Sequence, residues 1–479
     1  MVKVFSTSME YDYESPWQSL SPEAAFGSGV CIPGSFILTA AHVVADATFI
    51  QVQKARETTK VVAELYYVDH QCDLALLTVT ERGFFDNMKV TEVGTEEYLP
   101  SLRRKVQVVG FPIGGEEVSV TEGVVSRVEI QSYTHSRRKL LAITVDAAIN
   151  SGNSGGPVFL RNKVLGIAVQ AYDDAQNIGE IVPCPIIQHF LRRAKTRDRR
   201  SFPDFGASFQ NLEGKQLRKF KGMDDGEEGV LIKAVSAEQK KHDDIRVGDV
   251  LLQVDGRSVS NQGTVHFDSN GRFRTIFHVV FHRYQIGDKV PVRVLRDGKR
   301  EDIHVTLIPW MKLVPRSQYD IEPRFYVFGG LVFQPLTRNF LNVWGDDDWR
   351  ESAPLTLVYQ YYNGSLKDDL KEVVVFSTIL ADEINVGLNG YQNSVVKEVN
   401  GERVVDLLDF VNKVEAIKDG MVQIVTMGNV MLAFDAAEAA ASAERILSRY
   451  RIARDRHLGK THSSAARTVA QQVSEPNVE

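Results

Sequence analysis

Ser154 stands in a run of glycine, asparagine and serine residues, Asn150-Ser-Gly-Asn-Ser-Gly-Gly-Pro157. The glycines of this run permit backbone conformations that a Cβ would forbid. Such a turn lets successive N–H groups point into one small volume, where the oxyanion of a tetrahedral intermediate would lie. A plain Gly/Ser loop explains this order less well, because a strand follows directly. The run predicts a nucleophilic Ser154 and an oxyanion hole made by the N–H groups of Gly152, Asn153 and Ser154.

A serine nucleophile needs a neighbouring base, and the chain has eleven histidines. His42 differs from the others because it ends an apolar run at small residues, Ile37-Leu-Thr-Ala-Ala-His-Val-Val. Small neighbours leave room for the imidazole to face a cleft. By itself, a histidine in such a run would more often be a buried, hydrogen-bonded core residue than a catalytic base. The glycine-rich run around Ser154 makes the catalytic interpretation the stronger one. His70, His135 and His189 lie among polar residues and are expected at the surface.

The third catalytic group must orient the imidazole and stabilise its cation. Asp73 stands at the head of an apolar strand, where an unpaired carboxylate would be costly. Asp69 is the nearest rival, although its neighbours look solvated, and Asp146 is assigned to the substrate side or to a strand edge. The predicted triad, in chain order, is His42, Asp73 and Ser154.

Short strands rich in β-branched residues and bounded by turn residues occupy positions 24 to 190, which predicts an all-β barrel or sandwich. Mixed α and β patterns follow Pro203. Val254-Asp-Gly-Arg-Ser-Val259 aligns with Val399-Asn-Gly-Glu-Arg-Val404, and an apolar helix is expected after each, so a diverged repeat is predicted. Asp435 and Glu438 predict the start of an Ala-rich helix. The expected domains are residues 1–196, 203–312 and 324–431, followed by a C-terminal helix and flexible tail over 432–479.

Three motifs, in His–Asp–Ser order, resemble the chymotrypsin-fold serine proteases of the DegP/HtrA family, in which a catalytic domain precedes one or two PDZ domains. The motifs are Thr39-Ala-Ala-His-Val-Val, Cys72-Asp-Leu-Ala-Leu-Leu and Gly152-Asn-Ser-Gly-Gly-Pro. The long second repeat unit, with Ser126-Arg-Val-Glu-Ile and Asp146-Ala-Ala-Ile-Asn, most resembles the eukaryotic plant-type Deg proteases with two PDZ-like domains. The sequence departs from the family at Ala40, usually Asn, and at Ser151, usually Pro.

The resemblance implies a mainly β fold, a chymotrypsin-like double β-barrel protease domain followed by two PDZ-like α+β domains. It implies that the strand carrying Ile167, Ala168 and Val169 pairs with an extended substrate by β-addition. In the first PDZ-like domain, Phe205, Gly206 and Ala207 form the candidate turn for binding a peptide carboxylate. The same residues are equally consistent with an ordinary turn that binds nothing. The second PDZ-like domain shows no clear glycine-rich loop for binding a peptide carboxylate. A role in packing or assembly is therefore as well supported by the sequence as peptide binding.

Composition excludes several other classes of protein. The 479 residues carry 56 Lys plus Arg and 62 Asp plus Glu, a net charge of −6, which argues against a general nucleic-acid binder. No apolar stretch approaches the ~18 residues of a membrane-spanning helix. Three scattered cysteines predict neither a disulfide framework nor a zinc cluster, and they favour a reducing compartment. No metal or cofactor is expected. The N-terminus lacks a signal-peptide h-region, and an organelle remains open if a targeting segment was removed.

These features predict an ATP-independent serine endopeptidase that cleaves unfolded or damaged proteins in protein quality control. The alternatives are a resting or inactive PDZ-containing chaperone or scaffold, and a narrow processing protease with a specific client. The family resemblance implies unfolded or misfolded polypeptides as partners and a homo-oligomer built of trimers, as a trimer or hexamer. Val4, Phe5 and Trp17 are candidates for the trimer contacts.

Overall fold

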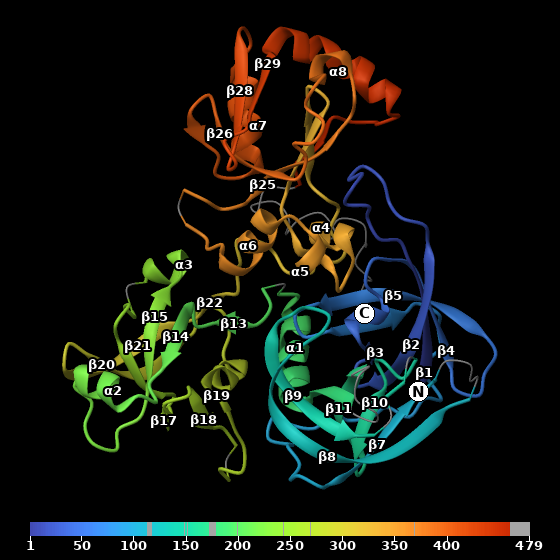
Figure 1. The fold of residues 1–479 in the computed structure, drawn as a ribbon. Helices are drawn as coiled ribbons and strands as arrows, with labels where there is room; N and C mark the ends of the chain where they lie inside the picture. Colours follow the sequence, from blue (N-terminus) through green and yellow to red (C-terminus); the bar gives the residue numbers. More distant parts are fainter. Residues whose placement is uncertain are drawn as a thin grey trace, which may run out of the picture. The chain divides into compact units, whose positions relative to one another are not determined.

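The computed structural model describes residues 1–112, 117–147, 149–150, 152–171, 179–198, 200–242, 244–268, 270–367 and 369–459 (Figure 1). The chain divides into two compact units. Unit 1 contains Met1–Met9, Pro22–Met311 and Ser317–Asp320, and unit 2 contains Glu10–Ser21, Lys312–Arg316 and the chain from Ile321 onward. Residues 10–21, expected in the barrel domain, therefore belong to unit 2.

The first barrel of unit 1 closes in the strand order β1-β2-β3-β6-β5-β4, and all of its pairings are antiparallel. Alternate residues of a strand point to opposite faces, so Val2 and Val4 of β1 lie inside the barrel at 0% exposure. Val4 is therefore not available as an oligomer contact. The elements are β1 (Val2–Ser8), β2 (Glu23–Ile32), β3 (Phe36–Thr39), η1 (Ala41–Val43), β4 (Ala47–Lys54), β5 (Lys60–Asp69) and β6 (Leu74–Val79).

The second barrel closes in the order β10-β11-β12-β9-β8-β7, so the expected chymotrypsin-like double barrel is confirmed. A helix, α1 (Cys184–Thr196), follows it. The strands are β7 (Lys105–Gly110), β8 (Ser119–Ser132), β9 (Lys139–Asp146), β10 (Pro157–Leu160), β11 (Lys163–Ala171) and β12 (Gly179–Pro183).

Unit 1 also contains the first PDZ-like domain, whose main sheet has the order β14-β15-β16-β20-β21. One continuous hydrophobic core runs through both barrels and this domain. The elements are β13 (Pro203–Asp204), β14 (Ala207–Asn211), α2 (Lys215–Phe220), β15 (Val230–Val235), α3 (Ala237–Lys240), β16 (Val250–Val254), β17 (Arg257–Ser258), β18 (Thr264–His266), β19 (Arg274–Ile276), η2 (Phe277–Arg283), β20 (Lys289–Arg296), β21 (Lys299–Thr306) and β22 (Ile308–Pro309).

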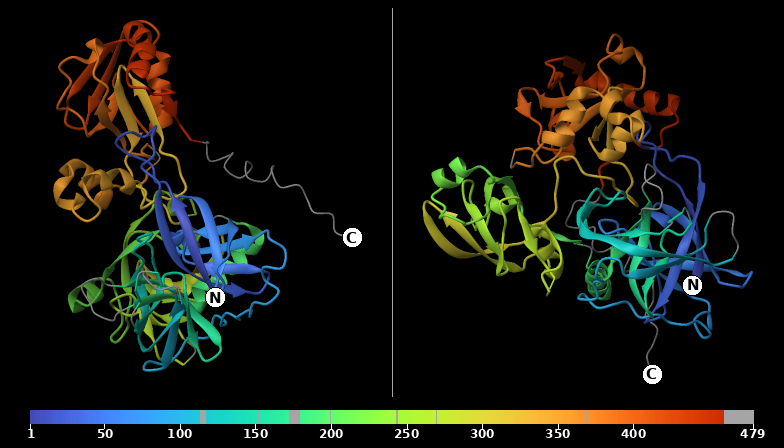
Figure 2. Two further views of the ribbon diagram at one scale, coloured as in Figure 1. Left: turned by 90° about the vertical axis from the view of Figure 1, so that its right-hand side faces the viewer. Right: turned by 60° about the horizontal axis from the view of Figure 1, so that its bottom comes forward.

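Unit 2 is built on a sheet with the order β29-β28-β26-β25-β24-β23-β30, and Figure 2 shows it from two further directions. Residue 431, the expected end of the second PDZ-like domain, is the first residue of β29, and α8 and β30 also belong to this unit. The elements are β23 (Phe325–Phe328), β24 (Leu331–Pro335), α4 (Arg338–Leu341), η3 (Asn342–Trp344), α5 (Trp349–Ser352), α6 (Leu355–Asn363), β25 (Val374–Ile379), η4 (Glu383–Asn385), β26 (Ser394–Val399), β27 (Glu402–Arg403), α7 (Leu407–Ala416), β28 (Met421–Thr426), β29 (Met431–Asp435), α8 (Ala436–Arg449) and β30 (Arg456–His457).

The predicted repeat is present as two strand-turn-strand hairpins with the same register, but the helix expected after each hairpin follows only the second. There α7 follows β27, whereas β18, β19 and the 3-10 helix η2 follow β17. Val254 pairs with Arg257 across the β16–β17 turn, and Val399 pairs with Glu402 across the β26–β27 turn. Both turns place two left-handed residues between the strands, Asp255-Gly256 in one and Asn400-Gly401 in the other. This geometry matches the right-handed twist of the flanking strands, which is why Asp-Gly and Asn-Gly favour it.

The edge strand β23 of unit 2 is covered by the chain's own β30. Phe325 pairs with His457 and Tyr326 pairs with Arg456, and the Val327 N–H donates to the Asp455 carbonyl at 2.8 Å. The Arg456 guanidinium forms an ion pair of 2.7 Å with Glu415 of α7. A strand that is already paired in this way cannot accept an extended peptide at the same edge.

Candidate active site

The structure brings His42 and Asp73 together on the first barrel. His42 lies in η1, and Asp73 is the last residue of the turn before β6, with φ of 54°. The Asp73 carboxylate accepts two hydrogen bonds from His42, one from its backbone N–H at 2.8 Å and one from its ring Nδ1 at 2.7 Å. Because both carboxylate oxygens are used, the ring is held in one orientation and its Nε2 is directed away from Asp73.

Electrostatics favour a charged Asp73 and a basic His42. Burial alone would lower the pKa of His42, but the charge and the hydrogen bond of Asp73 outweigh it and raise that pKa. Burial alone would raise the pKa of Asp73, which is 3% exposed, but the charge and hydrogen bonds of His42 lower it. A buried carboxylate that stays ionised beside the imidazole is what stabilises the imidazolium formed during acyl transfer.

Ser154 reaches the first barrel through its backbone. Its carbonyl accepts a hydrogen bond of 2.8 Å from the Ser28 N–H. A Cβ on Gly155 would lie 2.2 Å from Thr39 Oγ1, and a Cβ on Gly27 would lie 2.8 Å from the Ser154 carbonyl oxygen. Gly155 also has φ of +81°, which an L side chain rarely adopts. Glycine at these positions thus allows the serine loop to touch the segment that carries His42.

Hydrogen bonds orient the peptide groups of the predicted oxyanion hole. Ser28 Oγ donates to the Gly152 carbonyl at 2.7 Å, and the Gly156 N–H donates to the Asn153 carbonyl at 2.8 Å. The latter bond directs the Ser154 N–H the opposite way, because N–H and C=O of a trans peptide are antiparallel. The Asn153 N–H donates to the Asn150 carbonyl at 2.9 Å and is therefore engaged. Of the three N–H groups predicted to form the oxyanion hole, only those of Gly152 and Ser154 have no acceptor within the described part of the chain.

The Ser154 hydroxyl is half-buried, and across the described residues no hydrogen bond joins it to the His42 ring. Catalytic hydrogen bonds are often long before substrate binds, so this arrangement is compatible with catalysis. It also corresponds to a resting site in which the last contact of the triad has not formed.

The predicted substrate strand is only partly free. Ile167 pairs with Pro157 and with Val182 inside the barrel. Ala168 uses both backbone groups on the catalytic loop, donating to Gly156 at 2.9 Å and accepting from Gly155 at 2.8 Å. Val169 lies at a β-bulge where the register of β11 against β12 shifts. On the side that faces β10, the edge of β11 is therefore unpaired only from Val169 to Ala171.

In the first PDZ-like domain the candidate turn is closely packed. Phe205 is fully buried, and its ring stacks on Phe281 with centroids 5.5 Å apart, so the side chain belongs to the core. The Gly206 N–H donates to Asp204 Oδ1 at 2.8 Å, and the same carboxylate accepts from Arg138 at 2.9 Å. Ala207 begins β14, whose outer edge has no strand partner among the residues that the structure describes.

The other candidates from the sequence lie elsewhere. Asp69 accepts hydrogen bonds of 2.7 and 2.8 Å from Ser201 Oγ and does not contact His42, while Asp146 is exposed. Two of the three histidines expected at the surface are buried, since His189 is 0% and His135 is 8% exposed. His135 contacts His70 beside the catalytic pair. No sequence signal marks this contact, because its partners come from distant segments.

Glycines also occur in unit 2 where the sequence shows no clear carboxylate loop. Gly329 and Gly330 form the turn between β23 and β24, with φ of 56° and 76°. The turn follows β23, whose outer edge is taken by β30.

No group of three His, Cys, Asp or Glu residues suited to a metal ion is found within the described ranges. Cys31, Cys72 and Cys184 are free and buried. Among the helices described, none is long and apolar enough to cross a membrane.

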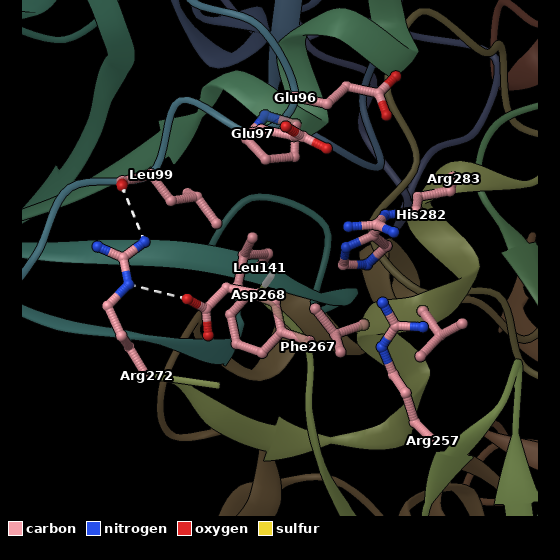
Figure 3. A pocket seen from close by; sticks show the side chains of 13 residues that line it. Glu96, Glu97, Leu99, Leu141, Arg257, Phe267, Asp268, Arg272, His282 and Arg283 are labelled. Carbon is pink, nitrogen blue, oxygen red and sulfur yellow. Dashed lines mark hydrogen bonds and ion pairs between the residues drawn. The ribbon is translucent and has the colours of Figure 1, made fainter. Parts of the chain in front are cut away.

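A cavity of about 120 Å³ lies apart from the triad, within unit 1 (Figure 3). Its lining includes Leu141 of β9 and Val279 of η2, and none of His42, Asp73 or Ser154. In Figure 3 the Arg272 guanidinium spans Asp268 Oδ2 at 2.9 Å and the Leu99 carbonyl at 3.4 Å. The volume of this cavity is well below that of a typical ligand pocket, so the cavity is a weaker candidate for the functional site than the segment around His42, Asp73 and Ser154.

Comparison with known proteins agrees with this geometry. Residues 27–167 match the trypsin-like peptidase domain family, and residues 314–458 match a PDZ domain family. Protease Do-like 4, mitochondrial, of Arabidopsis thaliana is 35% identical over 94% of this chain and 83% of its own length. Protease Do-like 2, chloroplastic, of the same plant is 32% identical over 88% of this chain and 68% of its own length.

Among solved structures, the HtrA-type protease AlgW with a tripeptide shares the fold, with a TM-score of 0.50 and 21% identity over 65% of this chain and 93% of AlgW. The family assignment rests on the trypsin-like peptidase domain, the PDZ domain and the plant relatives that match most of this chain. The chain belongs to the DegP/HtrA family of serine-type endopeptidases, among the plant-type Do-like proteases.

Proposed function

We propose that this endopeptidase uses His42, Asp73 and Ser154 as a catalytic triad to cleave unfolded or damaged polypeptides without ATP, in protein quality control. The observation that carries the proposal is that both carboxylate oxygens of Asp73 accept hydrogen bonds from His42. His42 Nε2 takes the proton of Ser154 Oγ as the oxygen attacks the scissile carbonyl, and it then gives that proton to the leaving amine. The N–H groups of Gly152 and Ser154 bind the oxyanion.

The proposed substrate class follows from the edges that remain open. Pairing from Val169 onward requires an extended chain, which a folded protein does not present. The outer edge of β14 offers a second place for an extended segment, whereas the edge of β23 is taken by β30. Because the β23 edge beside the Gly329-Gly330 turn is taken, we assign peptide binding to unit 1 and a packing or assembly role to the second PDZ-like domain, whose other terminal strand, β29, has no outer partner among the described strands.

A resting form of the enzyme is the second candidate state, because the described residues include no Ser154–His42 hydrogen bond. In this reading unfolded substrate completes the triad on binding. A permanently inactive scaffold is not expected to keep His42 paired with Asp73 in a chain that also retains Ser154.

Assembly and compartment are also proposals. We infer a homo-oligomer built of trimers from the family resemblance; light scattering of the purified chain would test it. The names of the two plant relatives place those proteins in mitochondria and chloroplasts, and an organelle is a fitting location for this chain. The three buried thiols are compatible with a reducing compartment.

The decisive experiment combines a fluorophosphonate probe with fluorescein-labelled casein as an unfolded substrate. Wild-type protein should be labelled and should degrade casein, and Ser154→Ala should do neither. Ser258→Ala, which removes an exposed serine of β17, should match the wild type. Labelling that survives in Ser154→Ala, or no labelling even with unfolded protein present, would refute the triad. Labelling without casein cleavage would indicate a narrow processing enzyme instead.

A further inference from the structure

A second hydrogen-bonded group lies beside the catalytic pair, on residues that the proposed mechanism does not use. His135, in the loop between β8 and β9, has its ring centroid 6.1 Å from that of His42. Its Nε2 is 2.9 Å from His70 Nδ1, and His70 Nε2 is 2.8 Å from Asp320 Oδ2. A continuous series of polar contacts thus connects a carboxylate with the ring next to the catalytic histidine.

Tyr319 holds His135 through both its ring and its backbone. The two rings stack with centroids 3.9 Å apart and planes 14° from parallel, and the Tyr319 hydroxyl donates to the His135 carbonyl at 2.9 Å. The pKa of His135 is lowered to about 3, chiefly by burial; the attraction of Asp73 opposes this most, while His70 and His42 add to the lowering. His135 is therefore neutral throughout the ordinary working range of pH.

The hydrogen-bond pattern assigns the protons of this series. A carboxylate only accepts, so His70 Nε2 carries a hydrogen toward Asp320. In neutral His70 the Nδ1 is then an acceptor, and the N–H that fills the contact comes from His135 Nε2. Burial would raise the pKa of Asp320, but the hydrogen bond from His70 lowers it, so its carboxylate remains available as an acceptor.

The segment that supplies Tyr319 and Asp320 is anchored close to the catalytic histidine. Asp46, three residues beyond η1, donates its backbone N–H to Asp320 Oδ1 at 2.8 Å. Asp320 returns the contact, donating its own N–H to Asp46 Oδ1 at 2.6 Å. Ser317–Asp320 belongs to unit 1, although the chain on both sides of it belongs to unit 2. We call this four-residue segment the clamp.

We propose that His135 is a positioning residue for the His42–Asp73 pair and that the clamp, Ser317–Asp320, holds it in place. A neutral ring next to Asp73 excludes water from the carboxylate without competing for its charge, so the attraction between Asp73 and His42 stays strong. When the clamp is docked, His42 is held for proton transfer. When the clamp is released, His135 loses its stacking partner and the carboxylate behind His70, and the catalytic pair loosens.

The test uses full-length protein with Tyr319→Ala and Asp320→Ala. Each variant should lower kcat on fluorescein-labelled casein about tenfold, less than the roughly 10²-fold that a 1 Å misplacement can cost, with KM unchanged. The rate of fluorophosphonate labelling should fall by the same factor, because the probe does not need the peptide groove. Tyr319→Phe, which keeps the stacked ring, should retain most of kcat. Asp302→Ala, which removes an exposed ion-paired carboxylate of β21, is the matched control.

The outcomes separate the clamp from a structural or substrate-binding segment. Unchanged kcat and labelling in both alanine variants would overturn the proposal, and so would a rise in KM with kcat unchanged. Because the proposal rests on the triad, a wild-type protein that shows no Ser154 labelling would count against the triad first. Histidine ¹³Cε1 NMR then decides independently. His135 should stay neutral between pH 8 and 5 in the wild type and titrate near its ordinary pKa in Tyr319→Ala; equal titration in both would overturn the clamp.

Discussion

Asp73 meets His42 with both carboxylate oxygens from a left-handed backbone position. This conformation is uncommon for a residue with a Cβ, although Asp tolerates it better than most. The conformation ends the turn before β6 and aims the side chain back at η1. At the residue scale, the proposed catalytic base, His42, is therefore oriented by a single side chain, which the local sequence already places at the head of an apolar strand.

Replacing that side chain predicts a specific change in pH dependence. Asp73→Asn should lower kcat by roughly 10⁴-fold, as expected when the imidazole loses its correct tautomer. His42 acts as a base only when neutral, and its pKa is raised above 6.5, so wild-type labelling should fall as pH drops through that raised value. Without the Asp73 charge the remaining burial lowers the pKa, and this fall should move to lower pH. Labelling rates between pH 5 and 9 measure it, with Asp302→Asn as control; an unmoved profile would contradict the assignment.

Two elements meet at a buried histidine contact inside unit 1. His189 of α1 donates from Nδ1 to the carbonyl of His282 in η2 at 2.9 Å, and its ring stacks on Phe202 at 4.1 Å. Burial lowers the pKa of His189 to about 4 and holds that of His282 well below its ordinary value. Both rings are neutral in the folded protein and must gain protons when the elements separate.

The stability of unit 1 should therefore depend on pH at this contact. A histidine with a lowered folded pKa contributes stability above its unfolded value of about 6.5, and this stability is lost as pH falls below it. His189→Asn keeps a donor near the position of Nδ1 and removes the titration. It should flatten the decline in unfolding free energy between pH 6.5 and about 4.5 by about 1.4 kcal/mol per pH unit.

Urea denaturation of unit 1 across this pH range is the measurement. His304→Asn, at an exposed position of β21, should leave the slope as it is in the wild type. An equal slope for His189→Asn and wild type would show that this histidine is protonated, or exposed, in the folded state.

At the scale of the whole molecule, the hydrophobic cores divide as the two units do. One core is shared by both barrels and the first PDZ-like domain, and separate clusters fill unit 2. Each unit then has the buried surface needed for its own cooperative transition, while the barrels and the first PDZ-like domain should unfold together.

Two core substitutions test this division. Phe277 of η2 and Phe410 of α7 are both fully buried, one in each unit. Truncation of either to alanine should cost about 3–5 kcal/mol in its own unit. Calorimetry of Phe410→Ala should show one lowered transition and one unchanged, and fluorophosphonate labelling should be lost only with the transition that Phe277→Ala lowers. A single transition moved equally by both variants would contradict two independent units.

Local patterns allowed much of the fold to be predicted. The barrel strands, the paired Asp-Gly and Asn-Gly hairpins and the start of α8 at Asp435 all follow from period-two alternation, turn chemistry and capping, which act between near neighbours. The contacts that the sequence did not reveal are long-range. The pairing of β30 with β23, and the membership of residues 10–21 in unit 2, depend on which distant segments meet.

The sequence by itself determined the chemistry of the candidate site, since the residue types around His42, Asp73 and Ser154 limit the reaction to serine-based acyl transfer. Tertiary structure alone decided which amides of the Gly152–Ser154 turn have no acceptor among the described residues, where the edge of β11 becomes unpaired, and that His70, His135 and Asp320 gather beside His42 and Asp73. The contact between His70 and Asp320 spans 250 residues. A charge or a ring acts on whatever lies within a few ångströms of it, and that neighbourhood exists only once the chain has folded.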